Sequence, residues 1–250
     1  MDLCQECVSS AARALPVPPG VVPVRPPVPG RSQHCLLLAV DVAGFTARGR
    51  DDEVQLVIRD ALYRLLIAAF CTCGIAWETC HHEDRGDGVL VVVPLHFPTI
   101  VVVDALVPRL RAGIRRHNRL SSEIARIRLR VAVHVGEVHR DRYGVAGVAV
   151  NHLFRLLDAP AVKETLSAGS GELALIVSDY LYGSVLLPAG EHADLDAYLP
   201  VEVALKETRA RAWIQAPAQR SAIRWNRPSI ETPMPTRDPA GPAPARSVRV

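Results

Sequence analysis

The sequence predicts an α+β domain with a ferredoxin-like βαββαβ core, extended by a C-terminal helix and hairpin. Three observations support this fold class: short apolar runs typical of buried strands, two long segments with helical spacing, and the order in which these patterns occur. That order is strand, helix, strand, strand, helix, strand, helix, strand and a terminal hairpin. Element order alone defines a fold class and shows no function.

The first four elements lie between residues 36 and 93. The stretch Leu36–Thr46 begins as an apolar run and ends at a glycine, which predicts a buried strand. Asp51 and Asp52 can cap a helix whose apolar residues recur at spacings of three and four up to residue 69. Residues 77–83 then predict a strand, and residues 89–93 its hairpin partner.

The later elements follow from the same two periodicities. Apolar residues with helical spacing predict a helix over 99–117, with a kink at Pro108, and strict alternation over 127–135 predicts a strand that Gly136 ends. The remaining expected elements are a helix over 150–158, a strand over 173–177, a short helix over 178–183, and a hairpin of 201–205 with 211–214.

Composition indicates one globular domain flanked by tails. With 250 residues, of which 49% are hydrophobic, the chain can bury a sizeable core. We expect a Pro-rich disordered leader over 1–34, a folded domain over 35–216 and a disordered Pro/Arg-rich tail over 217–250. The first ten residues do not resemble a secretory signal, and no apolar run reaches about 20 residues. A cytoplasmic protein without a membrane span is therefore expected.

Net charge is unevenly divided along the chain. The formal charge is +3, but residues 217–250 contain six Arg against one Glu and one Asp, so the remainder carries about −1. An excess of positive charge in a tail, instead of along one folded face, argues against nucleic-acid binding by the domain. We therefore expect nucleic acid to be an improbable partner.

Two carboxylates flank the apolar strands. Asp41 lies at the end of the first strand, and Asp87 lies in an Arg-Gly-Asp-Gly turn just before the strand over 89–93. Asp41 alone could cap a helix or turn the chain. Two Asp residues at the ends of two buried strands, however, supply the oxygen ligands that a divalent cation needs.

These residues also carry a family resemblance. The segments Asp41–Thr46 (DVAGFT), Gly86–Gly88 (GDG) and Gly147–Arg155 (GVAVNHLFR) resemble the successive signatures of class III nucleotidyl cyclase catalytic domains. The resemblance covers about residues 35–215, and its specificity lies in the combination of motifs in this order. It implies an α+β cyclase-like fold around the ferredoxin-like core.

The resemblance implies a phosphorus–oxygen lyase that converts a nucleoside triphosphate into a 3′,5′-cyclic nucleotide and pyrophosphate. Asp41 and Asp87 would hold two Mg²⁺ or Mn²⁺ ions per site. Asn151 would orient the ribose, and Arg155 would meet the charge that develops at the α-phosphate. On spacing alone, Arg155 could instead be a surface residue paired with Asp158.

The resemblance also implies a set of substrate-binding residues. Backbone amides around Ala43, Gly44, Phe45 and Thr46 match the segment that cradles the β- and γ-phosphates. Lys206 lies where the family often has a Lys-Gly turn that contacts the triphosphate, but Glu207 replaces that Gly here. Lys206 is thus either a phosphate contact or a solvated hairpin charge.

Base selection in the family usually rests on two positions, which are Glu83 and Gly144 in this chain. A Glu at the first position resembles guanylate cyclases, because a carboxylate can accept hydrogen bonds from N1–H and N2–H of guanine. Gly144 offers no side chain, so GTP is favoured while ATP or a pyrimidine triphosphate stays open. Glu83 could equally be a hairpin residue paired with Arg85.

The implied assembly is a head-to-tail homodimer, in which the metal carboxylates of one subunit face the Asn and Arg of the other. One alternative is a catalytically silent cyclase-homology module that binds nucleotide or a partner in signalling. A third possibility is a palm-like domain associated with nucleic acid, since ferredoxin-like cores with two Asp also polymerise nucleotides.

Overall fold

A computed structural model describes residues 32–169, 171–190 and 193–215. The expected tail over 217–250 and most of the expected leader lie outside the described residues. Residues 32–34, which were expected to belong to the leader, form the start of the first strand.

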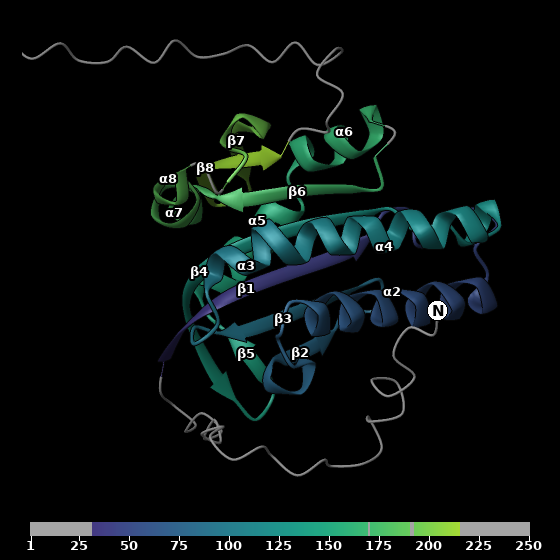
Figure 1. The fold of residues 1–250 in the computed structure, drawn as a ribbon, viewed down its shortest axis with the longest axis horizontal. Coiled ribbons are helices and arrows are strands. Elements are labelled where there is room, and N and C mark those ends of the chain that lie inside the picture. The colour runs from purple at the N-terminus through teal and green to yellow at the C-terminus, as the bar shows by residue number, and fades with distance from the viewer. Residues whose placement is uncertain (1–31, 170, 191–192, 216–250) are drawn as a thin grey trace, which may run out of the picture. The chain divides into compact units, whose positions relative to one another are not determined.

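The described strands form one mixed sheet (Figure 1). They are β1 (Ser32–Val42), β2 (His81–Asp84), β3 (Gly88–Pro94), β4 (Leu129–Asp141), β5 (Gly144–Ala146), β6 (Leu173–Ser178), β7 (Tyr198–Leu205) and β8 (Thr208–Gln215). Their order is β2-β3-β1-β4-β6-β8-β7, with β5 paired to β4; β4 and β6 are parallel and the other pairs antiparallel. The run β2-β3-β1-β4 is the strand order of a ferredoxin-like core. The predicted fold class is thereby confirmed.

Helices cover both faces of this sheet. The α-helices are α2 (Asp52–Thr72), α3 (Thr99–Val101), α4 (Val107–Leu120), α5 (Val148–Leu157), α6 (Pro160–Ala168), α7 (Asp179–Leu181) and α8 (Leu187–Ala189). Shorter 3₁₀ turns are η2 (Trp77–Thr79), η4 (Glu123–Ala125) and η7 (Leu195–Ala197), and π segments are η3 (Val102–Leu106) and η5 (Tyr182–Leu186). Among the described residues, no helix is long and apolar enough to cross a membrane.

Strand β1 is buried on both faces. Leu36, Leu38 and Val40 belong to the core that includes α2 and α4, which lie in front of the sheet in Figure 1. Leu37 and Ala39 belong to a second core, which includes α5 and α6. Burial on both sides explains why this strand is continuously apolar instead of alternating. It also places Asp41, two residues after Ala39, on the α5 side of the sheet.

Strand β4 continues through Gly136, so the prediction that this glycine ends the strand was wrong. Gly136 pairs with Cys35 of β1, and a Cβ atom at position 136 would lie 2.6 Å from the Ala149 Cβ. The glycine therefore lets α5 approach the sheet closely, and does not interrupt it. Strand β5 and helix α6 were not predicted from the sequence, and residues 77–79, predicted as strand, form a 3₁₀ turn.

A π segment interrupts the helix expected over 99–117 just before Pro108. Residues Val102–Leu106 form π turns, and α4 begins at Val107 with Pro108 in its first turn. The same arrangement recurs where η5 ends at Leu186, two residues before Pro188. Proline has no N–H and crowds the carbonyl four residues earlier, and a widened turn relieves both problems.

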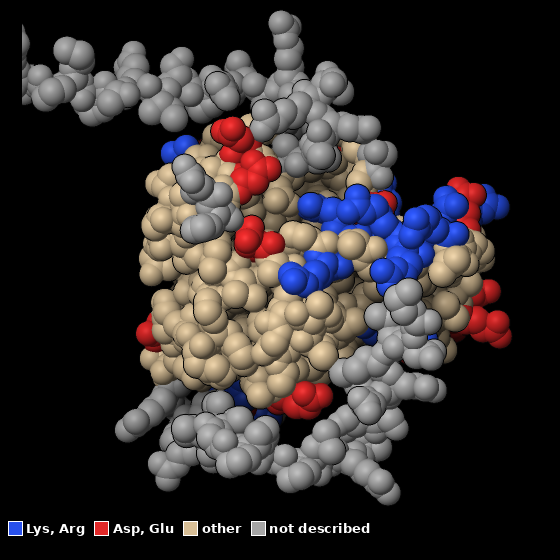
Figure 2. Space-filling model, viewed as in Figure 1, with Lys and Arg blue, Asp and Glu red and all other residues tan. Residues whose placement is uncertain are grey.

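Helix α4 carries a basic outer face. Its arginines are Arg109, Arg111, Arg115, Arg116 and Arg119, and the helix contains no acidic residue. Figure 2 shows blue side chains gathered over α4. The near-neutral total charge before residue 217 therefore includes a local excess of arginine on α4. The expectation that nucleic acid is an improbable partner stays a prediction.

Candidate active site

Asp41 and Asp87 lie next to each other at one end of the sheet. In the β1–β3 register Asp41 is opposite Gly88, and the carbonyl oxygen of Asp87 accepts a hydrogen bond from Val42 N at 2.8 Å. Gly88 allows this close approach, since a Cβ atom there would overlap the backbone of β1. The two carboxylates that the sequence separates by 46 positions are thus neighbours on adjacent strands.

Asp41 is buried and paired with an arginine that the sequence analysis did not single out. The residue is 9% exposed, and Arg130, opposite it on β4, donates from Nε to Oδ1 at 2.8 Å and from Nη2 to Oδ2. Burial raises the pKa of Asp41 to about 6, although Arg130 acts in the opposite direction. The nearby carboxylates of Asp87 and Asp158 raise the pKa further. This concentration of negative charge favours binding of a cation.

A second network holds the turn that carries Asp87. Asp84 accepts hydrogen bonds from Arg59 Nη2 and Tyr63 Oη, both at 2.6 Å, and from Gly86 N at 2.8 Å. Burial alone would raise the pKa of Asp84, but these donors outweigh it and lower the pKa to about 2. Arg59 also donates to the Gly86 carbonyl. Helix α2 therefore fixes the β2–β3 turn through a carboxylate that the motif did not identify.

The segment expected to cradle phosphate leaves β1 as a tight turn. Gly44 has a φ of +65°, which a glycine adopts readily. The Arg50 guanidinium donates to the carbonyls of Gly44 at 2.9 Å, Ile124 at 3.0 Å and Arg126 at 2.7 Å. Ala43 N donates to the Arg128 carbonyl at 2.8 Å. That amide is therefore engaged within the fold, while Arg50 holds the turn in place.

Asn151 and Arg155 lie on α5, as the spacing predicted. Asn151 is exposed. Arg155 pairs with Glu207 at 3.0 Å, whereas the alternative partner, Asp158, lies 3.8 Å from Lys163 Nζ. Arg155 Nε is buried and has no hydrogen-bond partner among the described residues. The Arg155 side chain as a whole is 19% exposed, and such a partly exposed guanidinium is suited to an additional anion.

Glu207 belongs to the tip of the β7–β8 hairpin. Lys206 and Glu207 form its two-residue connection, and Lys206, with a φ of +53°, is the one non-glycine residue with positive φ in the described part of the chain. Lys206 is exposed. The hairpin therefore brings the Glu207 carboxylate to Arg155.

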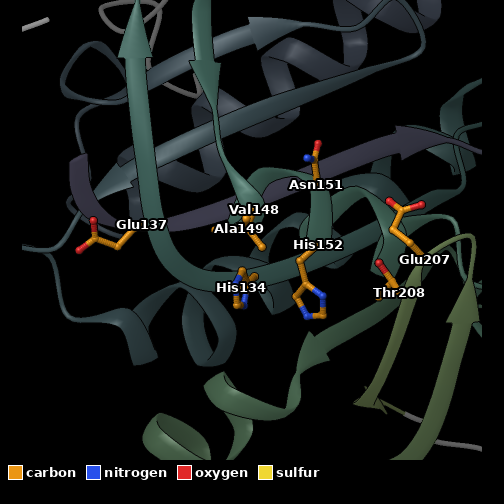
Figure 3. A pocket seen from close by; sticks show the side chains of 8 residues that line it. All are labelled: His134, Glu137, Val148, Ala149, Asn151, His152, Glu207 and Thr208. Atoms are coloured by element: carbon orange, nitrogen blue, oxygen red, sulfur yellow. The ribbon is translucent and has the colours of Figure 1, made fainter. Parts of the chain in front are cut away.

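An open pocket of about 680 Å³ lies beside α5. It is lined by His134, Glu137, Val148, Ala149, Asn151, His152, Glu207 and Thr208 (Figure 3). His134 and His152 stack edge to face with ring centroids 4.8 Å apart, and His134 Nδ1 lies 2.8 Å from Ser178 Oγ. Asp41 and Asp87 do not line this pocket. Within one chain, the carboxylates of Asp41 and Asp87 thus lie outside the lining of the pocket at Asn151.

Glu83 and Gly144, the two expected base-selecting positions, are brought together although 61 positions separate them in the sequence. Glu83 Oε1 accepts a hydrogen bond from Val145 N at 2.8 Å, and Oε2 accepts one from Arg85 Nη2 at 2.7 Å. Burial alone would raise the pKa of Glu83, but hydrogen bonds from His81 and Val145 lower it overall. Oε1 thus has two partners within the chain, since His81 Nε2 also lies 3.0 Å away, and Oε2 has one.

No protein-family model matches the chain, and no curated protein matches its sequence. Among solved structures, it is similar to the guanylyl cyclase Cya2 (18% identity, TM-score 0.54), over 75% of this chain and 92% of that one. It is also similar to an adenylate/guanylate cyclase/hydrolase from Silicibacter pomeroyi (20% identity, TM-score 0.52), over 75% of this chain and 98% of that one. The chain thus has the fold of class III adenylate/guanylate cyclase catalytic domains, as its motifs predicted.

The donor set at the strand ends fits a hard divalent cation. Among residues 32–169, 171–190 and 193–215, no cluster of three or more His, Cys, Asp or Glu side chains could hold a metal ion. Mg²⁺ is commonly held by one or two carboxylates together with substrate phosphates and water. Asp41 and Asp87 could supply those two carboxylates, provided that Arg130 releases Asp41.

Proposed function

We propose that this chain is a metal-dependent nucleotidyl cyclase, which converts a nucleoside triphosphate to a 3′,5′-cyclic nucleotide and pyrophosphate. The observation that carries the proposal is the pairing of Asp41 with Asp87 at adjacent strand ends of a cyclase-type sheet. GTP and ATP are the first substrates to consider. The partly unsatisfied Arg155 supplies the independent anion-binding group.

Two Mg²⁺ or Mn²⁺ ions held by Asp41 and Asp87 would lower the pKa of the attacking 3′-hydroxyl and neutralise charge on the leaving group. The chain's own residues perform the remaining tasks. Asn151, exposed on α5, orients the ribose. Arg155, whose side chain is 19% exposed, donates from its guanidinium to an oxygen of the α-phosphate, where negative charge accumulates in the transition state. The turn at Gly44–Thr46 receives the terminal phosphates.

We further propose a head-to-tail homodimer with two shared sites. The separation of Asp41 and Asp87 from the pocket at Asn151 supports this assembly. A second copy of the chain would bring its own Asn151 and Arg155 to the carboxylates of the first.

The direct test uses purified protein and each of the four nucleoside triphosphates, with Mg²⁺ or Mn²⁺, and detects cyclic nucleotide by mass spectrometry. We expect a cyclic product that requires the metal and disappears on chelation. An Asp41→Asn/Asp87→Asn protein is the matched control for contaminating activity. Failure to form any cyclic product, although the protein is folded and dimeric, would exclude the enzyme.

A second candidate function is a catalytically silent cyclase-homology module. It is favoured by the two ion pairs that occupy the expected catalytic groups, Asp41 with Arg130 and Arg155 with Glu207. In the same assay this function predicts triphosphate binding, measurable by calorimetry, without any product.

Replacing Glu207 by Gln should strengthen binding of the triphosphate. The substitution keeps the side-chain size but removes a negative charge that competes with phosphate for Arg155. Because the Glu207 side chain is 73% exposed, we expect only about a two- to fivefold fall in the dissociation constant for the triphosphate. Glu202→Gln, on the same hairpin and without a described ion pair to Arg155, is the control. An unchanged or weaker affinity would contradict the competition between Glu207 and phosphate.

A further inference from the structure

Glu83 connects two parts of the sheet that are distant in sequence. Its Oε1 accepts from Val145 N at 2.8 Å and lies 3.0 Å from His81 Nε2, while Oε2 accepts from Arg85 Nη2 at 2.7 Å. Val145 belongs to β5, which pairs with β4 and does not pair with β2. The carboxylate is thus the link between the β2–β3 hairpin and the β4–β5 hairpin.

Gly144 leaves the space that this carboxylate occupies. A Cβ atom at position 144 would overlap Glu83 Oε1 and lie 3.1 Å from Glu83 Cδ. Gly144 also has a φ of +136°, a backbone conformation that residues other than glycine rarely adopt. Glu83 and Gly144 are therefore complementary in shape, and a larger residue at either position requires a change at the other.

The Glu83 carboxylate is connected to helix α5 at two places, through Val145 before the helix and through Arg85 and Phe154 within it. Strand β5 continues through Gly147 directly into α5, so the bond to Val145 holds the entry to the helix. Arg85, which Glu83 holds by an ion pair, places its guanidinium carbon 5.1 Å from the centroid of the Phe154 ring. Phe154 directly precedes Arg155 in α5. The entry and the second half of the helix that carries Asn151 and Arg155 are thereby both tied to Glu83.

We propose that Glu83 is a positioning residue that holds α5 in place, and that it does not select the nucleobase. Bidentate recognition of guanine would add one hydrogen bond to each oxygen, yet Oε1 already faces two partners, Val145 N and His81 Nε2, so a guanine N–H would have to displace one of them. Breaking these bonds would remove the contacts that join the β2–β3 hairpin to the helix that carries Asn151 and Arg155. The positioning role rests on the contacts alone, while the statement on base choice rests on the proposed cyclase function.

A double-mutant cycle tests the positioning role through protein stability and does not require a measurement of enzyme activity. The free energy of unfolding is measured in urea for the parent chain, Glu83→Ala, Gly144→Ala and the double variant. We expect Gly144→Ala to destabilise the parent, and to destabilise it less when Glu83 is already Ala, with a coupling of about threefold or more in the unfolding constant. Gly171→Ala, where a Cβ atom meets nothing within 4 Å, is the control. Additive effects of the two substitutions would overturn the proposed link.

Kinetics with GTP and ATP test the statement on base choice. We expect Glu83→Ala to lower kcat for both substrates by about tenfold or more, with the GTP/ATP ratio of kcat/KM changed by less than about threefold. Glu83→Gln, which keeps an acceptor for Val145 N, should recover part of kcat. A tenfold change in the ratio with unchanged stability would instead make Glu83 the base-selecting group. If no triphosphate is converted, the cyclase proposal fails, and the unfolding cycle still decides the positioning role.

Discussion

Mixing an Asp41→Asn variant with an Arg155→Ala variant is expected to restore cyclase activity that neither variant has alone. Asp41→Asn removes a charged metal ligand, and Arg155→Ala removes the guanidinium proposed to meet the α-phosphate. Loss of one such transition-state donor lowers kcat by about 100–1000-fold. In a head-to-tail homodimer, half of the randomly mixed dimers contain both variants, and each of these has one intact site. The mixture should therefore reach about a quarter of the parent activity.

The controls test whether the restored activity comes from a site shared between two chains. Arg64→Ala, on the exposed face of α2, is the matched arginine variant and should keep parental activity. Light scattering must show dimers in every sample, and urea unfolding must show that both single variants are folded. A mixture of intact dimers that is no more active than the separate variants would contradict the shared site.

Replacing Arg130 by Ala is expected to cost about 3–5 kcal/mol of stability at pH 8, because it leaves the carboxylate of Asp41 buried without its partner. Side-chain exposures of 16% for Arg130 and 12% for Asp41 leave little water to compensate. Urea unfolding at fixed pH measures the loss.

The loss should be smaller at pH 5. Burial already raises the pKa of Asp41 to about 6 in the parent, and removal of Arg130 takes away an interaction that lowers it. The folded variant therefore binds a proton more tightly than the unfolded chain, whose Asp has a pKa near 3.9. Stability then rises as pH falls through the folded pKa, since the cost of burying a charge disappears.

A double variant provides the control for this prediction. Asp41→Leu/Arg130→Met removes both charges and fills similar volume, so it should recover most of the stability lost in Arg130→Ala. Equal stability of Arg130→Ala and the parent at pH 8 would contradict the assignment of Arg130 as the partner that keeps Asp41 ionised.

The fold class could be predicted because the hydrophobic periodicity of each helix and strand depends on residues close together in the sequence. The alternation in β4 and the three- and four-residue spacing in α2 follow from which side of an element faces the core. Gly136 shows the limit of this reasoning. A glycine that ends a strand and a glycine that admits a helix have the same sequence pattern, and only the position of Ala149 distinguishes them.

Sequence motifs indicated the candidate site residues, whose catalytic roles stay predictions, but did not indicate the partners that these residues have in the fold. The residue types and order of Asp41, Asp87, Asn151 and Arg155 were sufficient to suggest a cyclase. Arg130 did not stand out, because it is one of several arginines that alternate along a strand. Its importance arises from the β1–β4 register, which places it opposite Asp41.

The sequence by itself therefore determined which groups this protein can offer. They are two carboxylates at strand ends, a glycine turn that follows the first of them, and an Asn and an Arg four positions apart on one helix. Only the tertiary structure decided which of these groups are free. In the fold, Asp41 forms an ion pair with Arg130, Arg155 forms one with Glu207, and Glu83 accepts a hydrogen bond from Val145 N. These pairs join residues that are 89, 52 and 62 positions apart, so local sequence patterns carry no information about them.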